Sequence, residues 1–148
     1  MKSIKIAAII TLLLMIGISA SLQAANRYSV NDGDWDSTST WSASSNGASG
    51  ASVPVAGDNV YIEKSHTVTV TTNAVCSSII FPAGTTSNLY GILNINSGIT
   101  LDVSGAITIP RAYGSYMNTL AVGAGTLNAG SIAFTNAGIV LRHQITIS

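Results

Sequence analysis

The sequence predicts an all-β protein: a right-handed parallel β-helix that follows a signal peptide and begins with a tryptophan-containing cap. Three observations favour this fold. Short segments alternate apolar and polar residues with a period of two, glycine and aliphatic residues recur about every 25 positions, and no stretch after residue 25 has the pattern of an amphipathic helix. Only 8% of the residues are charged, which suits stacked strands, because a charge there would lie beside its neighbours in successive layers.

Residues 1–24 have the pattern of a secretory signal peptide. Lys2 and Lys5 precede an apolar run at 6–18, and small and polar residues follow at 19–25. The apolar run is shorter than the roughly 18 residues of a membrane span, which disfavours the alternative of an uncleaved anchor. We expect cleavage after Ala24 and a mature chain of 124 residues. Its predicted location is extracellular or on a bacterial cell surface, with no membrane span after cleavage.

The mature chain is close to neutral. It keeps four basic and six acidic residues, a net charge of −2, and it has no basic surface pattern for nucleic acid. Cys76 is the only cysteine, so an intramolecular disulfide is excluded. Because Cys76 leads into an apolar strand pattern, we expect a buried and unreactive thiol.

Residues 25–52 are expected to form the N-terminal cap segment. Trp35 and Trp41 are large aromatic residues in a segment otherwise rich in Ser, Gly, Asn and Thr. The open end of a solenoid has to be covered, so the two indoles are predicted to pack over the first coil. The low-complexity residues 42–52 are interpreted as a flexible loop.

Residues 53–148 are expected to form the coils. Gly98 and Gly105 return as Gly123 and Gly130 at a spacing of 25, and the pair 68 and 70 returns at 93 and 95. The pair 100–101 returns at 126–127, with a slip of one residue. The predicted inward residues are Val60, Ile62, Val68, Val70, Ile79, Phe81, Leu93, Ile95, Leu101, Val103, Ile107, Ile109, Leu120, Val122, Leu127, Ile132 and Phe134.

The last coil is predicted to be open. Residues 111–118 are interpreted as a loop, and the sequence reaches residue 148 still in a strand pattern, with no polar cap. We therefore expect either a truncated piece of a longer protein or an end that meets a partner. If that partner is a second copy of the chain, the result is end-to-end self-association.

The order of these motifs resembles a known family. The motifs that follow one another are Gly33-Asp34-Trp35, Trp41 and the segments at residues 53–54, 57–60, 66–70 and 76–79. Their order resembles that in the N-terminal module of secreted parallel β-helix surface proteins of the Bacteroidetes type. The sequence is also similar in style to the eight-glycine extracellular domain, which is likewise part of a parallel β-helix. This resemblance covers roughly residues 31–135 and implies a structural or adhesive role without catalytic residues. Many members end in a sorting domain for type IX secretion, which this sequence lacks.

The sequence offers few groups for catalysis. Acidic residues are sparse after residue 53, no two share an alternating strand, and no Gly-x-Ser-x-Gly motif is present, so we expect no enzyme activity. His66 and His143 are interpreted as surface residues. Asp32, Asp34 and Asp36 could supply oxygen ligands to calcium, whereas an Asx-rich turn that positions Trp35 is the alternative. No other cofactor is implied.

Two candidate functions remain beside the structural and adhesive role. Tyr113 and Tyr116 share the irregular loop, where a solenoid often carries its binding residues, and they could stack on sugar rings. A carbohydrate-binding module is therefore one alternative. The other is the N-terminal part of a β-helix polysaccharide-degrading enzyme, whose acids further coils would have to supply. The expected partners are a polysaccharide or another surface protein.

Overall fold

The computed structural model describes residues 24–83, 90–111, 116–135 and 143–147. Nearly all regular structure in these ranges is β-strand, and the one helical element among them is the short 3-10 helix η1, Thr38–Thr40. The expected all-β class is confirmed. The strands belong to two sheets, and their shared core lies between them.

The larger sheet has seven strands in the order β11-β9-β7-β4-β1-β3, with β6 also paired to β9. Its strands are β1 Asn26–Ser29, β3 Trp41–Ser42, β4 Asn59–Tyr61, β6 Ala74–Cys76, β7 Ser78–Ile80, β9 Thr100–Pro110 and β11 Thr126–Thr135. The smaller sheet has five strands in the order β12-β10-β8-β5-β2. They are β2 Gly33–Asp34, β5 His66–Val70, β8 Gly91–Ile95, β10 Asn118–Gly123 and β12 His143–Ile147.

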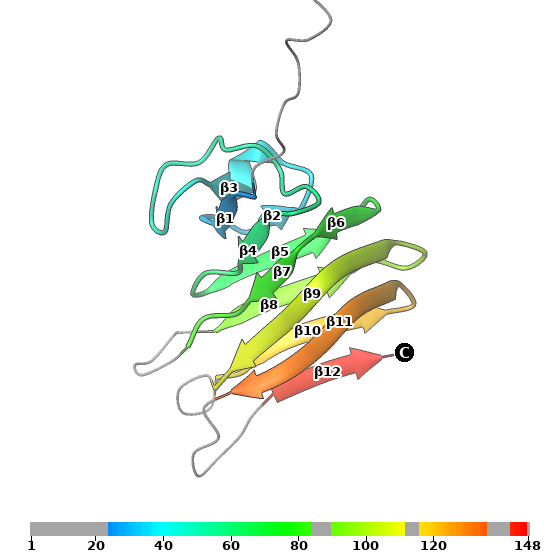
Figure 1. Ribbon diagram of the computed structural model, residues 1–148. Helices are drawn as coiled ribbons and strands as arrows, with labels where there is room; N and C mark the ends of the chain where they lie inside the picture. Colours follow the sequence, from blue (N-terminus) through cyan, green and yellow to red (C-terminus); the bar gives the residue numbers. More distant parts are fainter. Residues whose placement is uncertain (1–23, 84–89, 112–115, 136–142, 148) are drawn as a thin grey trace, which may run out of the picture.

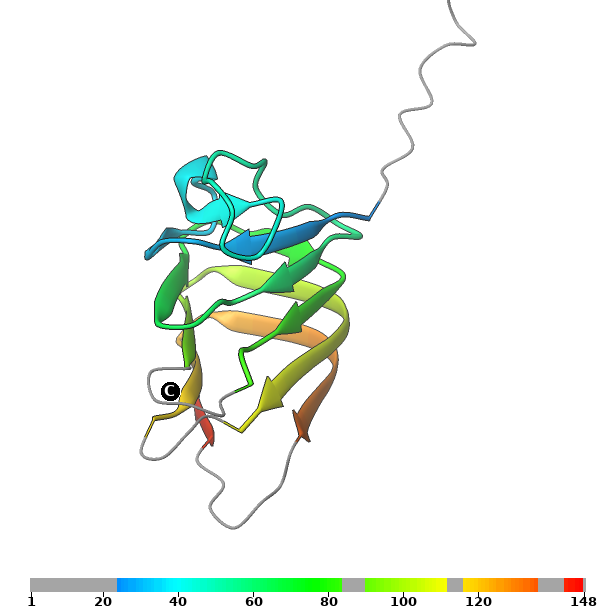
Figure 2. The same ribbon diagram turned by 90° about the vertical axis from the view of Figure 1, so that its left-hand side faces the viewer.

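From β7 onward the chain alternates between the two sheets, one strand in each. Successive strands of a sheet lie side by side, so the molecule descends in layers from the N-terminal segment at the top of Figure 1 to β11 and β12 at the bottom. Figure 2 shows the two sheets as separate rows of strands. Among the described strands only β1 and β3 pair antiparallel, and the other pairings are parallel.

The register follows the repeat seen in the sequence. Val68 lies beside Leu93 in β5 and β8, at the predicted spacing of 25, and Leu101 lies beside Leu127 at the predicted 26. Leu93 in turn lies beside Leu120. Identical or similar aliphatic side chains therefore stack directly on one another, which buries each layer against the next.

The core contains 14 of the 17 residues predicted to face inward, from Val60 to Val122. The prediction is wrong for Ile132 and Phe134, which are exposed, and Leu127 is only partly buried. All three belong to β11, the outermost described strand of the larger sheet. Their positions in the register are inward ones, but no further strand of this sheet lies beyond β11 in the described part of the chain.

Two glycines of the 25-residue repeat, Gly105 and Gly130, lie where neighbouring strands approach closely. A Cβ at Gly105 would meet the carbonyl oxygen of Ser77 at 2.8 Å, and one at Gly130 would meet that of Gly105 at 2.9 Å. Gly105 also donates its N–H to the Ser77 carbonyl oxygen at 2.8 Å. The 25-residue spacing of these two glycines thus reflects a bend at which backbone touches backbone in successive strands.

The N-terminal segment contributes strands to both sheets. Both sheets begin before residue 53, because β1 pairs with β4 and β2 pairs with β5. The loop at 42–52 is bound to the rest of the segment, since Gly50 and Ala51 both donate backbone N–H groups to the Trp41 carbonyl oxygen. In the described ranges, no helix is long and apolar enough to cross a membrane.

Candidate functional site

A polar pocket of about 260 Å³ lies where the N-terminal segment meets the corner between β4 and β5. Its walls come from the end of β1, the loop at 42–52 and the corner at 63–66. Residues from three separate segments therefore converge on one small space. The lining residues are Ser29, Val30, Asn46, Gly47, Glu63, Lys64 and His66.

Ser29 and His66 form the base of this pocket. Ser29 Oγ accepts the backbone N–H of Glu63 at 2.8 Å and lies 3.0 Å from His66 Nδ1. His66 Nδ1 is also 3.0 Å from the Ser29 carbonyl oxygen, which can only accept, so this contact requires a proton on Nδ1. Ser29 is fully buried. Its hydroxyl is therefore inaccessible to a substrate carbonyl, and the pair fixes the corner rather than forming a nucleophile and base.

The rim of the pocket carries groups of opposite charge together with an amide. Glu63 supplies a carboxylate, Lys64 an ammonium and Asn46 a carboxamide. Asn46 (φ 53°) lies on the rim and Ser65 (φ 63°) lies between Lys64 and His66, and within the described ranges these are the two non-glycine residues with positive φ. Such backbone strain is concentrated at turns and at sites whose side chains must be aimed. Donors and acceptors in this arrangement suit a hydroxyl-rich or zwitterionic ligand.

The three aspartates considered for calcium are all exposed. Asp32 Oδ1 accepts the backbone N–H of Thr67 at 2.7 Å, and Asp36 Oδ1 accepts the Thr71 hydroxyl at 3.4 Å. Asp32 and Asp36 therefore tie the two flanks of β2 to β5 and to the residue that follows β5. Among the residues that the structure describes, no group of three or more His, Cys, Asp or Glu side chains could hold a metal ion.

Of the two candidate sugar-stacking residues, the structure describes Tyr116. Tyr113 lies outside the described residues. Tyr116 is 38% exposed and stacks on Tyr90, with ring centroids 5.4 Å apart and planes 5° from parallel. One ring of the expected pair is therefore exposed, and the residue that supports it, Tyr90, was not the predicted partner.

Trp35 and Trp41 are both buried, as expected. Their rings meet edge to face at 5.2 Å, and the Trp41 indole donates its Nε1–H to the Trp35 carbonyl oxygen at 2.7 Å. Trp35 Nε1 is buried without a hydrogen-bond partner in the described part of the chain. Edge-to-face geometry is favourable for aromatic pairs, so this contact stabilises the segment beyond its buried area.

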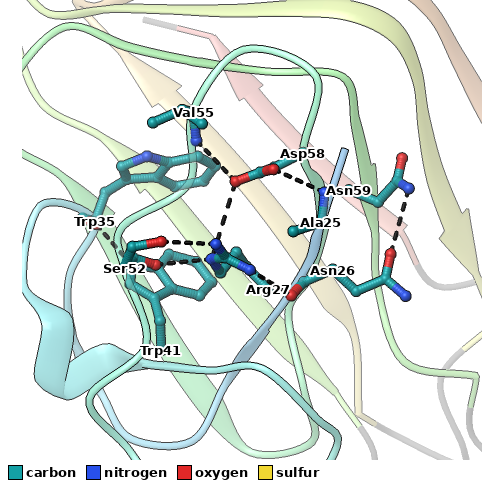
Figure 3. Close-up of polar contacts among 9 residues, drawn as sticks. All are labelled: Ala25, Asn26, Arg27, Trp35, Trp41, Ser52, Val55, Asp58 and Asn59. Carbon is teal, nitrogen blue, oxygen red and sulfur yellow. Dashed lines mark hydrogen bonds and ion pairs between the residues drawn. The ribbon is translucent and has the colours of Figure 1, made fainter. Parts of the chain in front are cut away.

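A second polar cluster surrounds Asp58, whose side chain is only 2% exposed. Its Oδ1 accepts the Ala25 N–H at 2.9 Å, and its Oδ2 accepts the Val55 N–H at 3.1 Å (Figure 3). Arg27 Nε is 3.9 Å from Oδ2 but donates at 2.8 Å to the Ser52 carbonyl oxygen. Asp58 thus holds the start of β1 and the turn before β4 together.

Cys76 lies near this carboxylate and is buried with a free thiol. Burial raises the pKa of the Cys76 thiol from 9.0 to about 12, and the negative charge of Asp58 adds to the rise. The expectation of a buried thiol is therefore confirmed. In its neutral form this thiol is a poor nucleophile and a poor metal ligand.

No protein-family model, curated protein or solved structure matches this chain. The geometry of the site therefore carries the functional argument by itself.

Several polar groups at these sites were missed from the sequence. His66 is half-buried and bonded to Ser29 rather than a free surface residue, and Asp58 is a buried anchor rather than only a turn residue. The interpretation of 111–118 as a loop is wrong at its end, because Asn118 begins β10 and is fully buried. The Pro-x-x-Gly-Asp turn at 54–58 was the available signal for Asp58, since aspartate commonly bonds nearby backbone N–H groups in turns.

Proposed function

We propose that this chain is a secreted, right-handed parallel β-helix with a structural and adhesive role. The observation that carries the proposal is the strand order: from β7 onward the chain alternates between two sheets through parallel pairings, and the register advances by about one repeat per layer. Crossover connections between parallel strands of a sheet are almost always right-handed, which supports the assigned hand. Such a stack presents broad outer faces that suit attachment rather than chemistry.

The N-terminal segment is proposed to be the cap of this helix. The antiparallel β1–β3 pair and the two buried tryptophans cover the first layer, so the apolar interior does not meet water there. A solenoid needs such cover to remain soluble.

Secretion rests on the signal-peptide pattern, with processing after Ala24. The first strand begins at Asn26, and Ala25 is already bound to Asp58, so ordered contacts start immediately after the proposed cleavage site. The protein is then extracellular or on a bacterial cell surface, and it does not depend on a disulfide.

The proposed partner is a polysaccharide or another surface protein, bound without turnover. The test uses purified mature protein on a glycan array and on polysaccharide-coated plates, with the release of reducing ends and unsaturated products measured in parallel. Binding without product supports the adhesive role. Release of either product would assign the chain to the polysaccharide-degrading enzymes and overturn the proposal, as would the absence of binding to glycans and to cell surfaces.

Carbohydrate binding at a defined site is the second candidate, and the polar pocket favours it. Lys64→Ala and Asn46→Ala remove rim groups without touching the core, whereas Tyr116→Ala removes the exposed ring of the Tyr90 stack. Loss of glycan binding in the first two variants would place the ligand in the pocket, and loss in Tyr116→Ala would place it on the tyrosine stack. Tyr28→Ala is the matched control, because Tyr28 stacks on Tyr61 with comparable geometry on β1 and β4.

A further inference from the structure

Within the described residues, the cationic partner of the buried Asp58 carboxylate is Arg27, whose Nε lies 3.9 Å from Oδ2. The two short contacts of the carboxylate come from neutral backbone N–H groups, those of Ala25 and Val55. Arg27 is the nearest cation, but its guanidinium donates to the Ser52 carbonyl oxygen, to Ser52 Oγ and to the Asn26 carbonyl oxygen. A carboxylate at 2% exposure is costly to bury, and a cation in direct hydrogen-bond contact would offset more of this cost than two backbone N–H groups and a guanidinium nitrogen 3.9 Å away.

The nitrogen nearest to this carboxylate is the one that signal-peptide cleavage would convert. Hydrolysis of the Ala24–Ala25 peptide bond adds water across it, leaving a carboxylate on Ala24 and an α-ammonium on Ala25. The Ala25 nitrogen is 2.9 Å from Asp58 Oδ1, and Figure 3 shows it facing that oxygen. Ala24 is exposed, so this bond lies at the surface, whereas Ala25 is half-buried.

Ala25 is also held on its other side. Its carbonyl oxygen accepts the Asn59 N–H at 2.8 Å, and β1 begins at the next residue. A new ammonium at this position would therefore stay in place after cleavage. We propose that Asp58 is the docking site for the mature N-terminus, and that processing after Ala24 creates a partly buried Ala25 ammonium–Asp58 ion pair, which locks the N-terminal segment onto the first layer. This inference rests on the proposed secretion and adds the site that receives the processed end.

The position of cleavage is critical for this pair. One additional residue would move the ammonium by about 3.8 Å, the spacing of consecutive Cα atoms, and would restore a neutral amide at Ala25. The pair also predicts that the uncleaved precursor is less stable than the product. Among the described residues, the charged and titratable groups recorded around it are Arg27, on β1, and Cys76, on β6, in addition to Asp58 itself.

The experiment compares three forms of the mature protein: a chain beginning at Ala25, the same chain with its α-amine acetylated, and a chain beginning at Ala24. The Ala25 form is expected to melt at least about 3 °C above the other two, because only it carries the ammonium at the carboxylate. The difference should vanish in Asp58→Asn and persist in the matched control Asp34→Asn, whose side chain is exposed. Equal melting temperatures in the wild-type forms, or a difference that persists in Asp58→Asn, would overturn the ion pair.

Two further measurements separate this inference from the proposed secretion. If Asp58→Asn does not fold, the reactivity of the Ala25 α-amine toward reductive methylation decides instead. It should be about tenfold slower than in the Ala24 form, and equal rates would count against the pair. The intact mass of the exported protein locates the cleavage. An N-terminus other than Ala25 would refute natural docking even if the engineered Ala25 form shows the pair, whereas an unexported and unprocessed chain would refute the secretion.

Discussion

Ile132 lies directly beside Ile107 in the register of β11 and β9, yet Ile107 is fully buried and 38% of Ile132 is exposed. The two side chains share a type and an inward position, so they differ only in whether another layer covers them. Ile107→Ala should lower the free energy of unfolding by about 2–5 kcal/mol, and Ile132→Ala by about 1 kcal/mol. Urea denaturation of both variants measures the difference. Equal losses would mean that Ile132 is covered in solution.

The same exposed face predicts self-association. Leu127 is partly buried, Ile132 is exposed and Phe134 is 47% exposed, all on the outermost described strand of the larger sheet. A row of apolar side chains at a strand edge is a template for pairing with another chain. Wild-type protein should show a concentration-dependent mass in analytical ultracentrifugation, and Ile132→Lys should reduce it.

Val75→Lys is the control for this experiment, because Val75 is 41% exposed on β6, a different strand of the same sheet. It should leave association unchanged. A wild-type protein that remains monomeric at high concentration would contradict the prediction, and so would association that survives Ile132→Lys.

The two tryptophans should respond differently to loss of the indole nitrogen. Truncation of either to alanine is expected to cost about 3–5 kcal/mol, because both are buried. Trp41→Phe also removes the hydrogen bond to the Trp35 carbonyl oxygen, which adds about 1–3 kcal/mol, whereas Trp35 Nε1 has no hydrogen-bond partner to lose within the described residues. Trp35→Phe should therefore be the milder change in thermal unfolding. The reverse order would show that Trp35 Nε1 is bonded in solution.

Asn118 should be the most sensitive polar residue in the layers. Its Oδ1 accepts the Gly91 N–H at 2.8 Å, and its Nδ2 donates to the Pro82 and Pro110 carbonyl oxygens at 3.0 and 2.7 Å. Asn118→Ala would leave these buried groups without their partner and should cost about 3 kcal/mol or more. Asn128→Ala removes only an exposed bond to Asp102 and should cost less than about 0.5 kcal/mol. Chemical denaturation of the pair tests the contrast, which equal midpoints would contradict.

The Cys76 thiol should be unreactive in the folded protein and should make stability depend on alkaline pH. Its pKa is raised from 9.0 to about 12, so its contribution to stability is complete below pH 9. Between pH 9 and 12 the unfolded thiol loses its proton while the folded one keeps it, and the free energy of unfolding falls by up to about 1.4 kcal/mol per pH unit. Urea midpoints across this range, with Cys76→Ala as the control that lacks this slope, measure the effect. Rapid labelling of native Cys76 by a thiol reagent near neutral pH would contradict it.

Much of the fold could be predicted because layer spacing is visible in the sequence. Val68 and Leu93, or Leu101 and Leu127, share a side-chain class, and stacking them is the way to bury both. The glycine spacing was equally visible, since Gly105 and Gly130 lie where backbones touch and a side chain does not fit. Burial failed as a prediction at Ile132 and Phe134, and in part at Leu127, because an alternating pattern gives the direction of a side chain and not what lies opposite it.

The polar sites were harder to predict, since their partners are distant in sequence. Ser29 and His66 are 37 positions apart, and Asn118 bonds to residues 8, 27 and 36 positions away. Hydroxyl and amide residues are common throughout this chain, so nothing local marks the few that become buried. The exposed candidates, Tyr116 and the three aspartates, were found by residue type alone, and the structure does not bring them together around one pocket.

The antiparallel β1–β3 pair makes the two ends of the larger sheet different, with β3 at one end and β11 at the other. The strands at this end of the larger sheet come from residues near the N-terminus. The described parallel pairings join positions that are only 19–35 residues apart in the sequence. No described strand has to wait for a distant segment, so each loop closes at a similar and modest entropic cost. If the chain is exported N-terminus first, as proposed, its N-terminal segment can therefore pair early, and each later strand adds to a strand already in place. Folding of this kind is vectorial, and if the chain is exported as proposed, it would keep the growing apolar edge to a single layer throughout export.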